Sequence, residues 1–372
     1  MTNFRDKLNL INPGTEKVVV GMSGGVDSAV AAALIKERGY RVTGVTMKIW
    51  AGNDSVEESI HHACYGPGEG DDIEDASNVC RILGIPYHVI DLTREYKAEV
   101  LDYYCAEYTA GRTPNPCFKC NSTVKFGALV RKTREAGIDF DFFATGHYAR
   151  VKYDENTKRY LLLKAADLAK DQSYFISALT QEQLAATMFP LADFNKSEVR
   201  ALAKGFGLSV DEKPESQDFI AGGYQSLIAA QPAGRIVNKA GDTLGEHQGI
   251  PFYTIGQRKG LGISAPEPQY VIDIDAENNT IIVGDKEDLL NNELVAGGLN
   301  WIAIDRLTEP MQVEARIRYR HKESKALLTP MDDNKAHVRF SEPQISITPG
   351  QTVVFYEGDM VIGAGTILKS KE

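Results

Sequence analysis

The stretch from Val18 to Ser28 constrains the fold more than any other part of the chain. It reads Val-Val-Val-Gly-Met-Ser-Gly-Gly-Val-Asp-Ser, and an Ala-rich apolar run over residues 29–35 follows it. β-branched residues favour a strand and the Ala-rich run favours a helix, so the small residues form the turn between them. Backbone N–H groups in such a turn, together with the helix dipole, favour a bound phosphate. The pattern predicts a doubly wound α/β fold with an anion site at the end of a strand.

The first part of the chain continues this pattern. Up to about residue 151, apolar strands alternate with helices, which indicates a parallel sheet covered on both faces. The expected strands are Val18–Val20, Arg41–Met47, Tyr87–Asp91 and Phe142–Thr145, and the expected helices are Ala29–Arg38, Glu74–Leu83, Ala98–Ala110, Val124–Glu135, Ser173–Met188 and Lys196–Phe206.

After about Lys213 the texture changes, because Gly and Pro separate short apolar pieces. This punctuation predicts a small β-rich central module, and the regularly spaced short strands after it predict an antiparallel β-barrel. The strands expected there are Tyr270–Ile274, Thr280–Val283, Val313–Ile317, Ala336–Phe340, Gln351–Phe355 and Met360–Ile367. We therefore expect three domains, at residues 1–212, 213–290 and 291–372.

Composition sets the class of protein. The chain has 372 residues, no apolar run long enough to cross a bilayer and no apolar core of a signal peptide at its start, which predicts a cytoplasmic protein that binds no membrane. The net charge of −10 does not exclude a nucleic-acid partner, since local clusters of cations decide such binding. Five cysteines, an odd number, argue for thiol or metal chemistry rather than a disulfide framework.

The most specific motif after the loop is Gly-Arg-Thr-Pro-Asn-Pro-Cys-Phe-Lys-Cys-Asn over residues 111–121. Its Cys-x-x-Cys, Cys117 and Cys120, suits a redox pair, two metal ligands or a nucleophile with a helper, and the alternative is a structural pair in a core. A helix expected over residues 122–130 would place Cys120 near a helix N-terminus. That position lowers a thiol pKa, which makes Cys120 a candidate sulfur nucleophile.

Taken together, the motifs resemble those of the bacterial tRNA-specific 2-thiouridylases within the ATP pyrophosphatase (PP-loop) superfamily. The motifs that carry the resemblance are Ser-Gly-Gly-Val-Asp-Ser, Gly-Arg-Thr-Pro-Asn-Pro-x-x-x-Cys-Asn, Ala-Thr-Gly-His-Tyr-Ala, Lys-Asp-Gln-Ser-Tyr-Phe from residue 170 and Tyr-Thr-Ile-Gly-Gln-Arg-Lys-Gly-Leu-Gly from residue 253. The resemblance implies a cytoplasmic transferase for tRNA modification. It would adenylate the C2 carbonyl of the wobble uridine, position 34, replace that oxygen with sulfur, and release AMP and diphosphate.

The resemblance and the expected strand ends also imply a set of site residues. The ATP-binding residues are Gly21, Met22, Ser23, Gly24, Gly25, Val26, Asp27, Ser28, Met47 and Gly146, with Mg²⁺ near Asp27; the tRNA-binding residues are Asn115, Pro116, His147, Lys170, Asp171, Gln172, Arg318, Tyr319 and Gln351; the catalytic residues are Cys120, Cys117 and Asp27. Arg316, Arg318 and Arg320 recur with a period of two, which predicts one basic face of a strand. The expected partners are the tRNA anticodon loop and a sulfur donor, either a persulfide carrier protein or sulfide.

Two departures from the common family pattern affect the sulfur step. The common form has Asp where Cys117 stands, and it carries a second catalytic cysteine in the segment that here reads Lys-Pro-Glu-Ser-Gln-Asp-Phe-Ile-Ala-Gly over residues 213–222. Three alternatives follow: a [4Fe–4S] cluster held by Cys105, Cys117 and Cys120, with Cys64 in place of Cys105 as a variant; a Cys117/Cys120 persulfide pair; or zinc. Cys80 follows a helical apolar stripe and is expected in the core.

Two rival functions remain compatible with the loop. One is another PP-loop ligase or amidotransferase that acts on a small substrate. The other is a non-enzymatic ATP-binding or RNA-binding module with a structural metal. Both would keep the phosphate site at residues 21–28, so the rest of the site must separate them from the thiouridylase.

Overall fold

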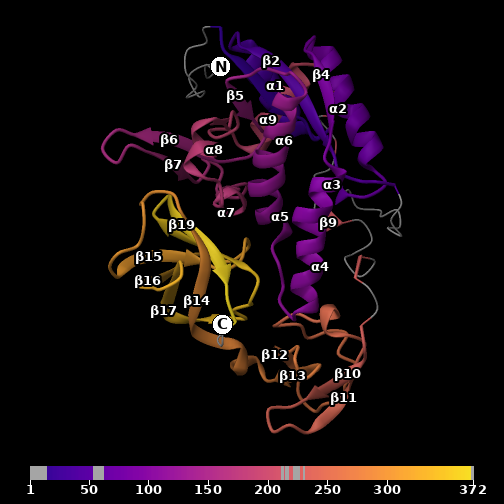
Figure 1. Ribbon diagram of the computed structural model, residues 1–372, viewed down its shortest axis with the longest axis vertical. Helices are drawn as coiled ribbons and strands as arrows, with labels where there is room; N and C mark the ends of the chain where they lie inside the picture. Colours follow the sequence, from indigo (N-terminus) through magenta and orange to yellow (C-terminus); the bar gives the residue numbers. More distant parts are fainter. Residues whose placement is uncertain are drawn as a thin grey trace. The chain divides into compact units, whose positions relative to one another are not determined.

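The computed structural model describes residues 15–52, 63–210, 213, 218–220, 227–228 and 231–369 (Figure 1). The chain divides into two compact units. The first contains residues 1–99, 117–224 and 359–361, and the second contains residues 100–116, 225–358 and 362–372. The three domains expected from the sequence, with boundaries at 212 and 290, stay a prediction.

A five-stranded sheet in the order β4-β2-β1-β5-β8 forms the centre of the first unit, and every neighbouring pair is parallel. Its strands are β1 Lys17–Gly21, β2 Arg41–Lys48, β4 Tyr87–Asp91, β5 Phe142–Ala144 and β8 Thr187–Met188. The central β1 is buried on both faces, as a Val-Val-Val run requires. The predicted parallel α/β sheet is confirmed.

Helices cover the sheet (Figure 1). They are α1 Val26–Glu37, α2 Glu69–Leu83, α6 Leu129–Glu135 and α9 Lys196–Gly205. Helix α1 packs against α2 and α9 in one apolar core, and α6 packs against β4. Helix α1 begins at Val26, three residues before the expected start, so the turn after β1 consists only of residues 22–25.

Shorter elements complete the first unit. They are β3 Ala63–Tyr65, α3 Thr93–Tyr96, α5 Pro116–Lys119, the π-helical segment η3 Cys120–Ala128, β6 Arg150–Asp154, β7 Arg159–Leu163, α7 Ser173–Ile176, α8 Gln181–Ala185 and β9 Asp218–Ile220. Strands β6 and β7 form a hairpin, and β3 pairs in parallel with β9. The π-helical η2 Lys97–Leu101 runs from the end of α3 into the second unit.

Two helix predictions are wrong in this unit. The helix expected over Ser173–Met188 is broken, because Thr180 caps α8 in a capping box with Gln183, and the chain then turns into β8 to pair with β5. The helix expected from Val124 begins at Pro116, since α5, η3 and α6 follow one another without a gap. Proline suits the first turn of a helix, where its missing N–H leaves no bond unmade. Cys117 and Cys120 therefore lie within a helical run instead of before it.

The second unit contains two β assemblies and helix α4 Asp102–Thr109. The smaller sheet has the order β11-β10-β13-β12. Its elements are β10 Gly234–Val237, β11 Thr243–His247, η5 Ile250–Phe252, β12 Tyr270–Asp275, β13 Thr280–Gly284 and η6 Lys286–Leu289. Ile236, Val271 and Ile281 are fully buried in its core.

The larger assembly is a closed six-stranded antiparallel barrel. Its strands follow the order β14-β17-β16-β15-β18-β19, and pairing of β14 with β19 closes it. They are β14 Leu290–Trp301, β15 Met311–Arg316, β16 Ser324–Met331, β17 Lys335–Ile345, β18 Thr352–Glu357 and β19 Met360–Ile367. The predicted C-terminal barrel is confirmed.

The basic strand face is not formed. Strand β15 ends at Arg316, and Arg318 and Arg320 lie in the turn that follows it, so the three side chains do not share one face of a strand. Arg316 is held by Glu323 at 3.5 Å. Across the described helices, none is long and apolar enough to span a membrane.

Candidate active site

The turn between β1 and α1 is closed by its own hydroxyl groups. Ser23 N donates to Ser28 Oγ at 3.1 Å, the two hydroxyls are 3.2 Å apart, and Ser28 Oγ donates to the Gly25 carbonyl at 3.1 Å. Gly24 has φ +70°, and a Cβ there would lie 2.4 Å from the Asp72 carbonyl oxygen. Only glycine fits at position 24, which fixes the turn against the N-terminal turn of α2.

A pocket of about 320 Å³ opens at the carboxyl ends of β1, β2 and β5. In an open parallel sheet this edge is where ligands bind. Nine of the ten predicted ATP-binding residues line it, namely Gly21, Met22, Ser23, Gly25, Val26, Asp27, Ser28, Met47 and Gly146. The nucleotide site predicted from the loop therefore coincides with a real cavity of a size suited to a small ligand.

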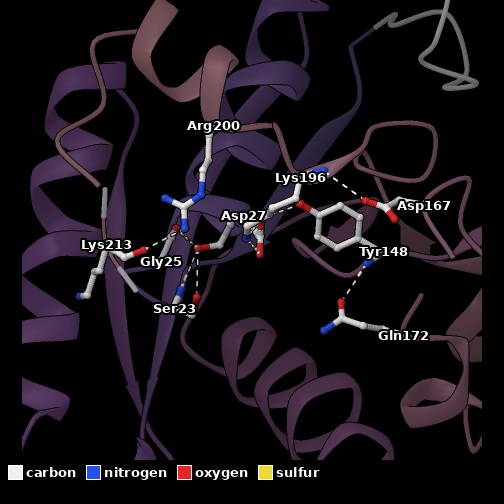
Figure 2. A network of polar contacts seen from close by, with 10 residues as sticks. Ser23, Gly25, Asp27, Tyr148, Asp167, Gln172, Lys196, Arg200 and Lys213 are labelled. Atoms are coloured by element: carbon white, nitrogen blue, oxygen red, sulfur yellow. Dashed lines mark hydrogen bonds and ion pairs between the residues drawn. The ribbon is translucent and has the colours of Figure 1, made fainter. Parts of the chain in front are cut away.

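Asp27 is the centre of a polar network beside this pocket (Figure 2). Both of its carboxylate oxygens accept from Lys196 Nζ at 2.8 Å, and Oδ1 also accepts from the Tyr148 hydroxyl at 2.8 Å. The Tyr148 backbone N–H in turn donates to Gln172 Oε1 at 3.0 Å. The network holds an ammonium group at a phosphate loop that has no lysine of its own.

Sequence reasoning missed Lys196. The residue is the first of α9, and its only signal was its place directly after Asn195, which caps the helix in a capping box with Glu198. It is separated from Asp27 by 169 positions in the sequence, so no local pattern links the two. The fold alone brings this cation to the loop.

A second cation, Lys213, also lines the pocket. Its Nζ donates to Asp72 at 2.7 Å and to Asp75, and Arg200 donates to its carbonyl at 3.5 Å (Figure 2). Burial works to lower the pKa of Lys213, but its hydrogen bonds to the two carboxylates outweigh burial and raise it. The ammonium group therefore stays charged in the pocket wall.

Gly146 and His147 close the pocket from the end of β5. A Cβ on Gly146 would lie 2.6 Å from both Asp27 C and Ser28 N, so glycine is needed for β5 to approach the start of α1. His147 Nδ1 is 2.8 Å from Thr145 Oγ1. Burial, and then the charge of Lys125, lower the pKa of His147 well below its usual range. The imidazole is therefore neutral at physiological pH and carries no charge toward a phosphate.

The Cys-x-x-Cys lies where the helix changes from α5 to η3. Each residue is half-buried, yet burial around the sulfur atom raises the pKa of Cys117 to about 12 and that of Cys120 to about 11. The charge of Lys125 opposes both shifts. The expectation that a helix N-terminus lowers the pKa of Cys120 is wrong, because the helix begins four residues earlier and desolvation dominates.

The remaining cysteines are distributed over both units. Cys64 is exposed and lines the pocket, whereas Cys80 is buried in the core between α2 and β2, as expected. Cys105 belongs to the second unit, where its Sγ donates to the Leu227 carbonyl at 3.5 Å. Among the residues that the structure describes, no three His, Cys, Asp or Glu side chains are grouped closely enough to hold a metal ion.

The residues predicted to bind tRNA in the first unit fall into two groups. His147 and Gln172 line the pocket. Asp171 is buried and holds a turn together, since it accepts from Ala165 N at 3.0 Å and from Ser173 Oγ at 2.7 Å. Lys170 N donates to the Asp167 carbonyl at 3.0 Å. A tRNA contact by each of them stays a prediction.

In the second unit, several of the predicted tRNA residues bond to the protein itself. Asn115 is buried and donates to Thr352 Oγ1 at 3.1 Å, and Gln351 donates to the carbonyls of residues 113 and 114 at 2.9 and 3.0 Å. Arg318 donates to the Ser346 carbonyl at 2.8 Å and to Thr348 Oγ1 at 2.6 Å. Pro116 is the first residue of α5, and Tyr319 lies in the turn after β15. Their roles toward tRNA also stay predictions.

The parallel sheet, the Ser-Gly-Gly-Val-Asp-Ser turn and the pocket at its strand ends define a nucleotide-binding enzyme of the PP-loop class. Domain profiles match along the chain: the tRNA methyl transferase HUP domain at residues 16–221, the tRNA methyl transferase PRC-barrel domain at 223–285 and the aminomethyltransferase beta-barrel domain at 291–367.

Full-length relatives narrow the class to one family. Proteins called tRNA-specific 2-thiouridylase MnmA are similar to this chain: 46% identical over 360 residues in Acetivibrio thermocellus, covering 95% of this chain and 99% of that one, and 46% over 363 residues in Clostridioides difficile, covering 95% and 99%. A relative called tRNA-specific 2-thiouridylase MnmA 1, from Caldanaerobacter subterraneus subsp. tengcongensis, is 48% identical over 369 residues, covering 95% and 98%. The chain belongs to the tRNA-specific 2-thiouridylase family.

Proposed function

We propose that this protein catalyses ATP-dependent 2-thiolation of the wobble uridine of tRNA. One observation carries the proposal: the phosphate loop at Ser23–Ser28 and a free thiol, that of Cys64, line the same pocket, with Lys125 beside them. Such a reaction needs a site for adenylation and a reactive thiol in the same cavity. Because the proposed substrate is tRNA, we also propose that the protein is cytoplasmic.

The first step forms an activated uridine. The C2 oxygen of uridine attacks the α-phosphorus of ATP, diphosphate leaves, and AMP is attached to that oxygen. The loop and Lys196 line one pocket, so we expect their N–H and ammonium groups to face the negative charge that grows on the phosphates. Preorganised donors of this kind lower the barrier. A uridine of an anticodon loop is unstacked at low cost, which lets it enter a pocket.

Asp27 is also the residue that suits Mg²⁺, because a carboxylate oxygen is its preferred protein ligand. Here both carboxylate oxygens of Asp27 accept hydrogen bonds from Lys196, so the ammonium group is the counter-ion of this carboxylate. Bound Mg²⁺ would supply further charge neutralisation for the departing diphosphate. The two hydrogen bonds from Lys196 already orient the carboxylate group of Asp27.

The second step replaces oxygen with sulfur. A sulfur nucleophile attacks C2, and AMP leaves with the original oxygen. Cys120 is one of the thiols that we assign to this step, since it and Lys125 stand on the same π-helical segment and Lys125 reaches the pocket. Among the described residues, no three cysteine side chains are grouped closely enough to hold a metal ion, and we propose that thiols alone carry this step. The donor that supplies the sulfur is a persulfide.

Release of AMP with and without tRNA tests the proposal. We expect the purified protein to release AMP from ATP only when unmodified tRNA is present, and to form 2-thiouridine when a persulfide donor and a thiol reductant are added. Nucleoside mass spectrometry detects the product. Release of AMP with a small carboxylate or amide and not with tRNA would instead identify a ligase, and ATP binding without any release of AMP would identify a sensor module.

A further inference from the structure

We infer that Cys64, on strand β3, is the sulfur-receiving thiol of this enzyme and works opposite Cys120. The inference deepens the proposed function and rests on it. It assigns a catalytic role to a residue outside the Cys-x-x-Cys, on a segment distant in sequence. Three independent features of the first unit support it.

The first feature is access. Cys64 is exposed and lines the pocket that contains the phosphate loop. Cys80 is buried in the core, and Cys105 hydrogen-bonds Leu227 in the second unit. Of the cysteines in the first unit, Cys64 is the one exposed to a donor that arrives from solution.

The second feature is the packing that brings β3 toward the Cys-x-x-Cys. Tyr65, next to Cys64, stacks on Tyr96 of α3 with ring centroids 5.6 Å apart and planes at 10°. Helix α3 packs against η3, which begins at Cys120. The pKa of Tyr96 is raised well above its usual range, mainly because the residue is buried. The negative charges of Cys120, Cys64 and Cys117 raise it further. The three thiols are therefore all near enough to Tyr96 to act on its hydroxyl group.

The third feature is Lys125. It stands five residues after Cys120 in a π-helical segment, where residues five apart are joined by the helix hydrogen bond and lie on one side. Its charge acts on Cys64, Cys117 and Cys120 alike and lowers the pKa of each. It opposes the local desolvation of the sulfur atoms, which acts on Cys64 as well although that residue is exposed. Lys125 also lines the pocket, together with Cys64 and the phosphate loop.

Strand pairing explains how position 64 takes this role. Strand β3 pairs in parallel with β9, with Tyr65 opposite Ile220. Strand β9 belongs to the segment 213–222, which has no cysteine in this chain. A thiol at position 64 is thus presented by the strand adjacent to that segment, in the same sheet.

The cycle conserves atoms and electrons. The Cys64 thiolate attacks the outer sulfur of a persulfide R–S–SH, R–S⁻ leaves, and Cys64 carries –S–SH. The outer sulfur, after losing its proton, attacks the adenylated C2, and AMP leaves. The Cys120 thiolate then attacks the sulfur of Cys64, the S–S bond breaks, and its electron pair stays on the sulfur of 2-thiouridine. The resulting Cys64–Cys120 disulfide takes two electrons from a dithiol reductant before the next turnover.

Peptide mass spectrometry on the wild-type full chain tests the assignment directly. After treatment with inorganic polysulfide and alkylation, we expect the added sulfur on the Cys64 peptide. After a single turnover with ATP and tRNA but no reductant, we expect a disulfide between the Cys64 and Cys120 peptides. A Cys117–Cys120 disulfide in its place would overturn the inference. So would iron in anaerobically purified protein that the C64S variant loses, because Cys64 would then be a metal ligand.

Variants separate this inference from the proposed function. C64S is expected to lose 2-thiouridine formation by at least about 100-fold, as removal of a covalent carrier should. C105S, the matched control, is expected to thiolate within twofold of wild type. Release of AMP with tRNA and the melting temperature report whether C64S folds. Wild-type thiolation by C64S overturns only the role of Cys64, whereas a wild-type protein that releases no AMP with tRNA overturns the proposed function.

Discussion

The phosphate end of the site, around Asp27 and its loop, and the thiol end, around Cys117 and Cys120, are built by opposite means. At the phosphate end, Asp27 is fixed by Lys196 and Tyr148 at 2.8 Å, and the turn closes on its own hydroxyls. At the thiol end, Cys117 and Cys120 are held by burial, with the charge of Lys125 as the opposing influence. One end is ionised and hydrogen-bonded, and the other is desolvated.

This difference indicates how the two steps are kept in order. The ion pair of Lys196 and Asp27 and the hydrogen bonds of the loop hold the phosphate end in one arrangement, so we expect adenylation to need little reorganisation of the protein. A buried thiol is mostly protonated at neutral pH, and the thiolate is the reactive form. The thiols of Cys117 and Cys120 are therefore mostly protonated at neutral pH, which protects them from adventitious electrophiles.

The strongest way to separate the two ends is to remove Cys120. The C120S variant is expected to lose 2-thiouridine formation by at least about 10⁴-fold, since a hydroxyl does not replace a thiol nucleophile in sulfur transfer. AMP release with tRNA is expected to persist, because the phosphate end is untouched. Parallel assays of AMP and 2-thiouridine make the comparison. An active C120S enzyme would contradict the sulfur-transfer assignment and leave only an adenylating activity.

The opposite change acts on the phosphate end. Lys196→Met removes the charge that Asp27 and the bound phosphates share, and we expect AMP formation to fall about 100-fold to 1,000-fold, as for loss of one preorganised donor. Lys204→Met, on the same helix α9 but exposed, is the matched control and is expected to leave AMP formation unchanged. Equal rates for the two variants would show that Lys196 supports the fold alone.

The sequence predicts the phosphate loop well and the contacts between distant segments poorly. The loop at residues 21–28 is contiguous, so its phosphate site could be identified from local pattern, and so could four of the five strands of the parallel sheet. Lys196 joins Asp27 across 169 positions and Tyr65 meets Tyr96 across β3 and α3, and neither contact has a local signature. The predicted pKa of Cys120 failed for a related reason: the helix start at Pro116 and the burial of the sulfur are properties of packing.

Substitutions at two glycines test whether the phosphate end depends on the close approach of β5 to α1. Gly146→Ala places a methyl group 2.6 Å from the backbone of Asp27 and Ser28, and we expect it to destabilise the fold by about 1–3 kcal/mol, as overpacking does. AMP formation should fall with it, because the start of α1 must move. Gly205→Ala, at the end of α9 with no atom within 4 Å of the new methyl, is expected to be neutral or stabilising by up to about 1 kcal/mol. Denaturant unfolding of the two variants measures both effects, and equal stabilities would contradict the close approach of β5 to α1.

The desolvated end makes the smallest but most direct prediction, in its pH dependence. Burial raises the pKa of Cys120 to about 11 from its ordinary value of 9.0, so at any pH below 9 the fraction of thiolate is about a hundredfold lower than in a free thiol. The rate of alkylation at Cys120 by iodoacetamide should therefore rise about tenfold per pH unit from pH 7 and keep rising above pH 9, where an unstructured cysteine peptide levels off.

The sign of the shift makes this measurement decisive between two descriptions of the thiol end. A helix-dipole site would lower the pKa, and alkylation would then be complete near neutral pH with little further change. Desolvation moves the curve the other way, and removal of the opposing cation by Lys125→Met should move it further to high pH, because less positive charge then stabilises the thiolate. A curve that shifts to low pH in K125M, or one that levels off at pH 7 in the wild type, would mean that the thiol end is preorganised like the phosphate end.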